Sequence, residues 1–110
     1  MHNCALSVWL AGCGLCGNTV KQEAKSPDGN YVATAFVRDC GATTAFTAQV
    51  HVRKAGTKME DTGNVYRGYL SDDIGLTWLS STHLIITSGC QEVRFHLTNF
   101  HGITIDRARR

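Results

Sequence analysis

This 110-residue sequence contains five cysteines, Cys4, Cys13, Cys16, Cys40 and Cys90, whose thiols could carry redox or metal chemistry. Residues 13–16 spell Cys-Gly-Leu-Cys, a CxxC spacing that in thioredoxin-like proteins follows a strand and opens a helix. Here glycines flank the motif and no βαβ pattern follows it. A zinc site needs four ligands, and neither Cys40 nor Cys90 belongs to a second pair of suitable spacing. A thiol-redox or metal site that combines Cys13 and Cys16 with Cys40 or Cys90 is therefore the alternative hypothesis.

The remaining polar side chains predict no catalytic site. The histidines are isolated, and His51 and His96 fall on the polar faces of predicted strands, where we expect them to be solvated. Asp72 and Asp73 are adjacent, so on an extended chain their carboxylates point apart. The sequence contains no nucleophile-elbow, zinc-protease or phosphate-loop motif. We therefore predict a protein without catalytic residues, metal ligands or cofactor.

The elements that must position these residues begin with a turn at residues 26–29, Ser-Pro-Asp-Gly. Proline presets φ for the second turn position and glycine accepts a positive φ. Residues 31–37 then predict a strand with apolar residues on both faces. Residues 46–53 alternate, with Phe46, Ala48, Val50 and Val52 on a predicted core face and their neighbours on a solvent face.

Further short strands are predicted along the second half of the chain. They cover residues 65–70, a hairpin of 76–79 and 84–87, an alternating strand at 93–97 with one buried face, and 103–105. No segment is a convincing helix. The pattern predicts an all-β domain, an antiparallel meander of about six to seven short strands that forms a curved sheet or a small sandwich.

Composition and charge argue against a nucleic-acid-binding protein and against a membrane-spanning helix. The length suits one domain, and the net charge of +2 comes from basic and acidic residues that are spread evenly. No basic patch of the kind that binds nucleic acid is present, so we expect no nucleic-acid partner. No apolar run reaches 18 residues, which is the length that indicates a membrane-spanning helix.

Three strings in the first half of the chain resemble a family of small uncharacterised bacterial lipoproteins. They are Leu-Cys-Gly-Asn at residues 15–18, Ser-Pro-Asp-Gly at 26–29 and Arg-Asp-Cys-Gly-Ala-Thr-Thr at 38–44. The resemblance implies a location and a fold but no activity. Cys16 and Cys40 both lie in the matching strings, so the resemblance implies a disulfide between them; two reduced, buried cysteines are the other interpretation.

The N-terminal segment agrees with that resemblance. Residues 5–10 are apolar, and residues 10–13, Leu-Ala-Gly-Cys, look like a bacterial lipobox, in which the cysteine, here Cys13, is acylated. We therefore divide the chain into a leader-like segment, residues 1–13, and a β domain, residues 14–110. The apolar segment is short, however, and no Lys or Arg precedes it. A functional leader predicts a lipid-anchored protein on the periplasmic face of the cell envelope. If this start is the true one, or if the gene is a captured mobile cassette, the protein would be cytoplasmic.

The prediction for function is a non-catalytic envelope or interaction protein. The polar loop after the first predicted strand supplies one carboxylate, two hydroxyls and exposed amides, and we predict it as a contact surface for an unidentified protein or small ligand. A membrane would be reached only through a lipid on Cys13. If residues 5–10 are retained, their apolar side chains must pack on the body or pair with a second copy as a homodimer. The contact residues are Asp39, Gly41, Thr43 and Thr44.

Overall fold

A computed structural model describes residues 16–41 and 45–110. These residues form nine strands and confirm the all-β prediction. The strands are β1 (Gly17–Lys25), β2 (Tyr31–Asp39), β3 (Thr47–Lys54), β4 (Tyr66–Tyr69), β5 (Ile74–Ser80), β6 (His83–Ser88), β7 (Glu92–His96), β8 (Asn99–Phe100) and β9 (Ile103–Arg109).

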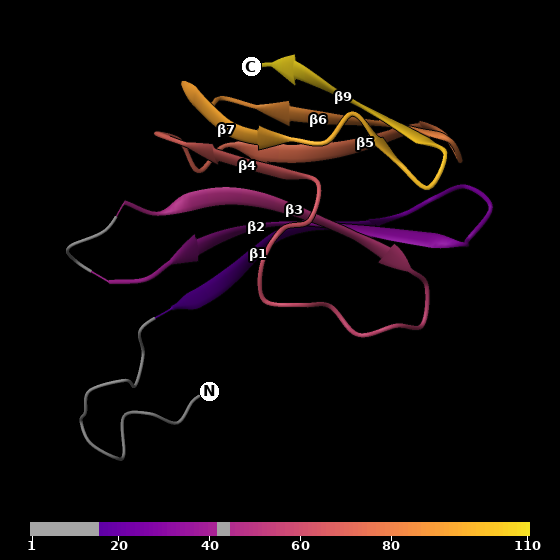
Figure 1. The fold of residues 1–110 in the computed structure, drawn as a ribbon, viewed down its shortest axis with the longest axis horizontal. Coiled ribbons are helices and arrows are strands. Elements are labelled where there is room, and N and C mark those ends of the chain that lie inside the picture. Colours follow the sequence, from indigo (N-terminus) through magenta and orange to yellow (C-terminus); the bar gives the residue numbers. More distant parts are fainter. Residues whose placement is uncertain (1–15, 42–44) are drawn as a thin grey trace.

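The strands form two layers (Figure 1). The first sheet has the order β1-β2-β3-β4-β7, and all its pairs are antiparallel. The second has the order β5-β6-β9-β8, in which β6 and β9 run parallel. A simple meander cannot make that pair. After β6 the chain crosses to the edge of the first sheet as β7 and then returns as β8 and β9, so the last part of the chain joins both sheets.

The turn between β1 and β2 matches its sequence signature. The Gly29 amide donates to the Ser26 carbonyl at 2.8 Å, and Gly29 has a φ of +77°. The Asp28 carboxylate accepts from the Asn30 amide at 3.0 Å and from the Ser26 hydroxyl at 2.7 Å. These hydrogen bonds lower the pKa of Asp28, and the bond from the Asn30 backbone amide has the largest effect. The turn therefore directs β1 back along β2 in register.

The hydrophobic core lies between the two sheets. Small and β-branched side chains of β2 and β3 face leucine and isoleucine side chains of β6 and β9, as expected for antiparallel strands with one covered face. Tyr66 of β4 closes the core beside them. The largest fully buried apolar members are Tyr66, Leu84, Ile86, Ile103, Ile105, Val50, Val52 and Val65.

The outer face of β3 is also buried, which corrects the prediction that His51 is solvated. His51 is only 3% exposed. Residues 55–64, here called the strap, cross this face. The Gly63 amide donates to Gln49 Oε1 at 2.7 Å, and the Asn64 side-chain amide pairs with both the N–H and the C=O of Val52 at 2.8 Å. The side chains of β3 alternate between two faces as predicted. The strap covers the outer face, which was expected to be exposed to solvent.

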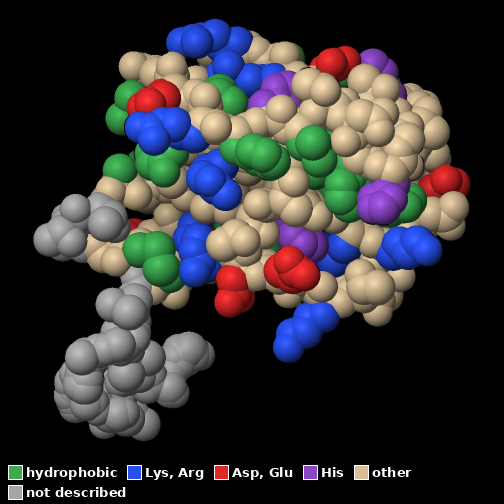
Figure 2. Space-filling view, in the orientation of Figure 1, with side chains coloured by type: hydrophobic (Ala, Val, Ile, Leu, Met, Phe, Trp, Pro, Cys, Tyr) green, Lys and Arg blue, Asp and Glu red, His purple; other side chains and the backbone are tan. Residues whose placement is uncertain are grey.

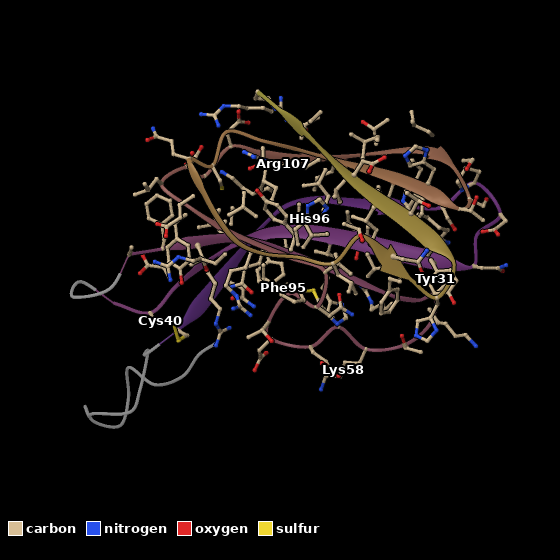
Figure 3. The ribbon with its side chains drawn as sticks, turned by 45° about the horizontal axis from the view of Figure 1, so that its top comes forward. Tyr31, Cys40, Lys58, Phe95, His96 and Arg107 are labelled. Atoms are coloured by element: carbon tan, nitrogen blue, oxygen red, sulfur yellow. A yellow bond between two sulfur atoms is a disulfide. The ribbon has the colours of Figure 1, made fainter. Side chains whose placement is uncertain are left out.

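A bulge corrects the prediction for β7. The register shifts opposite Arg67 and Gly68, so one extra residue of β7 is unpaired and the alternation of its side chains breaks. Phe95 is 39% exposed, beneath the Arg67 guanidinium, whose carbon is 5.9 Å from the ring centroid. His96 turns inward instead (Figure 3). Its ring meets Tyr66 edge-on, and Nε2 lies 2.9 Å from the Ile105 carbonyl oxygen. His96 is therefore a half-buried structural residue.

Charged side chains of both signs lie on the surface of the described residues. On the face drawn in Figure 2, basic side chains are scattered and acidic ones lie among them. Within the described ranges, no helix is long and apolar enough to cross a bilayer.

Candidate binding site

The five strands of the first sheet all have an end at one edge of the molecule. The registers place Asn18, Arg38, Thr47, Tyr69 and Glu92 in a single row across the sheet. Just beyond this row lie the start of β1, the end of β2, the start of β3, the end of β4 and the start of β7. We call this edge the loop end, because the predicted contact loop leaves β2 and enters β3 there.

A disulfide closes the loop end on one side. Cys16 and Cys40 are joined by an S–S bond of 2.03 Å, immediately beyond the Gly17–Asp39 pair of the β1–β2 hairpin. This is the pair of cysteines that the family resemblance implies. Because both thiols are spent in this bond, neither is available to the alternative redox or metal site. Cys13 lies outside the described residues.

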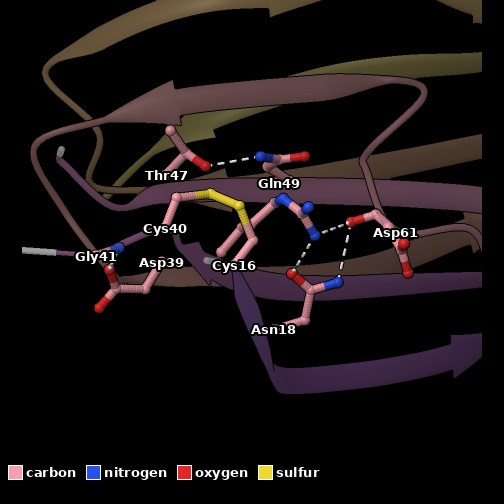
Figure 4. Close-up of a disulfide and its surroundings, with 9 residues drawn as sticks. Cys16, Asn18, Asp39, Cys40, Gly41, Thr47, Gln49 and Asp61 are labelled. Carbon is pink, nitrogen blue, oxygen red and sulfur yellow. Dashed lines mark hydrogen bonds between the residues drawn. A yellow bond between two sulfur atoms is a disulfide. The ribbon is translucent and has the colours of Figure 1, made fainter. Parts of the chain in front are cut away.

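Next to the disulfide, a polar knot fixes the strap to the hairpin (Figure 4). The Arg38 guanidinium donates to the Asp61 carbonyl at 2.8 Å and to Asn18 Oδ1 at 3.0 Å. The Asn18 amide donates to the same Asp61 carbonyl at 2.9 Å. One backbone oxygen of the strap is thus held by two strands, so the disulfide region and the strap form one unit.

The described part of the predicted contact loop is ordered by its own side chain. Asp39 Oδ1 accepts the Gly41 amide at 3.0 Å, and Gly41 has a φ of +118°, where a side chain would be strained. Thr43 and Thr44 lie outside the described residues. The contact role of the four residues is still a prediction, and the structure adds neighbours that the sequence did not suggest.

Those neighbours line a pocket of about 500 Å³ at the loop end. Phe46, just before β3, is 40% exposed, and Leu70, just after β4, is 59% exposed. Phe46 was predicted to face the core, but it lies one residue ahead of β3, at the rim. Among the described residues of the lining, Asp72 is the one that carries a charge. The described lining is Ala45, Phe46, Leu70, Ser71, Asp72 and Gln91.

Leu70 has an unusual backbone. Its φ of +71° is in the left-handed region, which costs a branched side chain about 1–2 kcal/mol. The chain uses this conformation to turn from β4 toward β5, and it leaves the leucine side chain in the open. Sequence reasoning missed this residue because nothing about a leucine at the end of a strand signals a positive φ. The structure therefore retains both strain and apolar exposure at one position.

Cys90, the free cysteine among the described residues, belongs to the core and not to the loop end. It is fully buried against Gly68, and its amide donates to Ser88 Oγ at 3.0 Å. The same hydroxyl oxygen accepts from the Tyr66 phenol at 2.9 Å. Burial raises the pKa of Tyr66, although the bond to Ser88 acts in the opposite direction. Across the described ranges no three His, Cys, Asp or Glu side chains cluster as metal ligands.

Comparison with known proteins gives a family but no activity. No curated protein and no solved structure matches the chain. One family model matches residues 13–101, which include both halves of the disulfide, the strap and the pocket. Over that range the chain belongs to a family of unknown function, DUF5412.

Proposed function

We propose that this protein is a non-catalytic binding module of the bacterial cell envelope, which presents its loop end to a protein partner. The observation that carries the proposal is the exposed pair Phe46 and Leu70. Exposed aromatic and aliphatic side chains around a concave pocket are typical of partner sites. The positive φ of Leu70 lowers the folding stability of the chain, and the conformation that causes this loss also exposes the leucine side chain.

The lining indicates the chemistry of the partner. Phe46 and Leu70 supply apolar surface to the lining, while Asp72 supplies a negative charge. This combination fits an apolar side chain that is followed by a basic group. The disulfide and the Arg38 knot hold the neighbouring strand ends rigid, so little conformational entropy would be lost on binding.

A photo-crosslinking pair tests the binding surface. A photoreactive phenylalanine analogue at position 70 is compared with the same analogue at position 79, since Leu70 and Leu79 are 59% and 61% exposed. We expect a discrete adduct from position 70 in the native host cells, none from position 79, and loss of the adduct when Phe46→Ser is added. The same adduct from both positions would refute a specific surface at the loop end.

The envelope location is a separate part of the proposal. It is supported by the disulfide, because such bonds persist in oxidising compartments, and by the lipobox-like residues 10–13. Intact mass spectrometry of protein from the native host tests it. We expect an acylated chain that begins at Cys13 and carries the Cys16–Cys40 bond. An unmodified chain that retains residues 1–12, recovered from the cytoplasm with free thiols, would contradict this location.

A further inference from the structure

A second pocket lies at the other end of β2, far from the loop end. Its volume is about 470 Å³, within the range of small-molecule sites. Tyr31 and Lys54 are cross-strand partners at the start of β2 and the end of β3. Figure 3 shows Tyr31 beside the turn that joins β8 to β9. The lining, here called the turn pocket, is Tyr31, Lys54, Thr57, Phe100 and His101, so both sheets contribute to it.

The polar groups of the turn pocket are unused. The Lys54 ammonium, the Tyr31 phenol and the His101 imidazole form no hydrogen bond or ion pair with any described residue. No Asp or Glu is among the lining residues. Lys54 and His101 are exposed and Tyr31 is half-buried, so three donors without an acceptor in the described chain are accessible around one concave surface, where an anion could accept from them.

The turn that supplies His101 to the lining has positive φ values at both central residues. His101 has a φ of +50° and Gly102 a φ of +84°, as in a type I′ turn between the paired residues Phe100 and Ile103. Asn, Asp or Gly usually occupies the first central position of that turn. Here a histidine bears the conformational cost, and its ring meets the Phe100 ring edge-on at 4.5 Å. A residue with an unfavourable backbone conformation that lines a pocket of donors without partners among the described residues indicates a ligand site.

We infer that the turn pocket binds a small organic anion with a flat apolar body, such as an aromatic carboxylate. The Phe100 and Tyr31 rings would cover the faces or edges of the flat body. Lys54 would carry the ion pair with the carboxylate, and the Tyr31 phenol and His101 imidazole would donate the flanking hydrogen bonds. Because all the ionisable lining residues are donors, the negative charge of the ligand decides affinity.

A titration followed by NMR tests this inference with two matched probes, indole-3-acetate and its neutral analogue indole-3-acetamide. We expect indole-3-acetate to bind with a Kd of about 1 mM, since drug-sized ligands gain roughly 0.3 kcal/mol per heavy atom. The largest chemical-shift changes should fall on Tyr31, Thr57 and His101. The amide should bind at least about tenfold more weakly, because it lacks the charge.

Two variants assign the charge to one side chain. Lys54→Gln should weaken indole-3-acetate binding about tenfold and leave the weak binding of the amide unchanged. Lys58→Gln, an exposed lysine of the strap outside the lining, should change Kd by less than about twofold. The spectrum of each variant verifies its fold.

Three results would overturn the inference. They are no binding of indole-3-acetate up to 10 mM (about ten times the expected Kd), equal affinity for the acid and the amide, and shift changes centred on Phe46 and Leu70. Binding at the loop end alone would reject the turn pocket, whereas the crosslinking experiment at position 70 tests the loop end independently, so the two proposals fail separately.

Discussion

His51 is the residue whose environment differs most from its sequence context. Burial, and then the Arg53 guanidinium, lower its pKa below the ordinary 6.5, while Glu60 acts in the opposite direction. Its Nδ1 is buried without a partner among the described residues. A proton on this ring would place a charge under the strap, where desolvation disfavours it. His51 therefore links strap closure to pH.

The pH dependence of stability follows from that linkage. The unfolded chain binds the His51 proton near pH 6.5, whereas the folded chain binds it only at a lower pH. The free energy of unfolding should therefore be fully retained above about pH 7.5 and should fall as pH drops below 6.5. Urea denaturation at several pH values measures this. His51→Gln should flatten the slope, and His101→Asn, on the surface, should not; equal slopes in both variants would contradict the prediction.

Gly63 offers a second test at the scale of one residue. A Cβ there would lie 2.7 Å from the Val50 carbonyl oxygen and 2.8 Å from that of Tyr66, and neither backbone atom can move freely. We expect Gly63→Ala to lower the free energy of unfolding by about 1–3 kcal/mol. Gly17→Ala is the matched control, because its Cβ meets nothing within 4 Å, and it should change stability by less than about 0.5 kcal/mol. A harmless Gly63→Ala would mean that the strap does not press on β3 as described.

At the scale of elements, two side-chain amides act as substitutes for a neighbouring strand. Asn64 pairs with both backbone groups of Val52, and Gln22 does the same for Leu76, at 2.8 and 3.0 Å. The bulge in β1 between Val20 and Gln22 aims this side chain at β5. The edge of β5 is thereby covered without a further strand. The Gln22 amide therefore bridges the seam between the sheets, and the Asn64 amide fixes the strap to β3.

Removing the Gln22 amide tests this role. Gln22→Ala would leave the N–H and C=O of Leu76 without their partners, so we expect a loss of about 1–2 kcal/mol. Gln22→Glu keeps the acceptor for the amide but sets a carboxylate against the Leu76 carbonyl, so it should be at least as destabilising. Lys21→Ala, at the exposed bulge residue, serves as control. Thermal and urea denaturation measure the stability of each variant. Equal stability of all three variants would show that water replaces the Gln22 hydrogen bonds without loss of stability.

The sequence predicted those elements whose signal is local. The Ser26–Gly29 turn and the hairpin of β5 and β6 were confirmed, because turn chemistry and alternation are encoded in adjacent residues. β1 was missed, since seven of its nine residues are exposed before the half-buried Ala24 and no periodicity marks it. The covered face of β3 and the inward turn of His96 depend on the strap and on a bulge, neither of which leaves a sequence pattern.

The candidate site, too, could be predicted only where its signal is local in the sequence. The disulfide came from a resemblance of strings and not from spacing, and the pocket was not predicted at all. Its lining comes from three separate segments, around residues 45, 71 and 91, and only the register of β3, β4 and β7 brings them together. Tertiary pairing therefore supplied what local patterns could not.

At the scale of the whole molecule, the Cys16–Cys40 bond is the main covalent constraint described. It closes a loop with a sequence separation of 24, which in the chain-entropy model stabilises by about 3.5 kcal/mol. The double variant Cys16→Ser with Cys40→Ser should lose up to this amount and show a lower Tm. A reductant should lower the Tm of the parent but not that of the double variant. A parent protein indifferent to reductant would contradict the expectation.

The position of that bond also determines how the molecule bears a pulling force. Tension applied to the chain ahead of Cys16 divides at the sulfur atoms and reaches β2, an inner strand of its sheet, as well as β1 at the edge. The chain between the two cysteines cannot be extended by force while the disulfide bond is intact. In the reduced protein, these 24 residue steps would add roughly 80 Å of contour length on stretching. In the oxidised protein, the disulfide prevents this extension. The disulfide thus makes the N-terminal side of the described structure a short, stiff link.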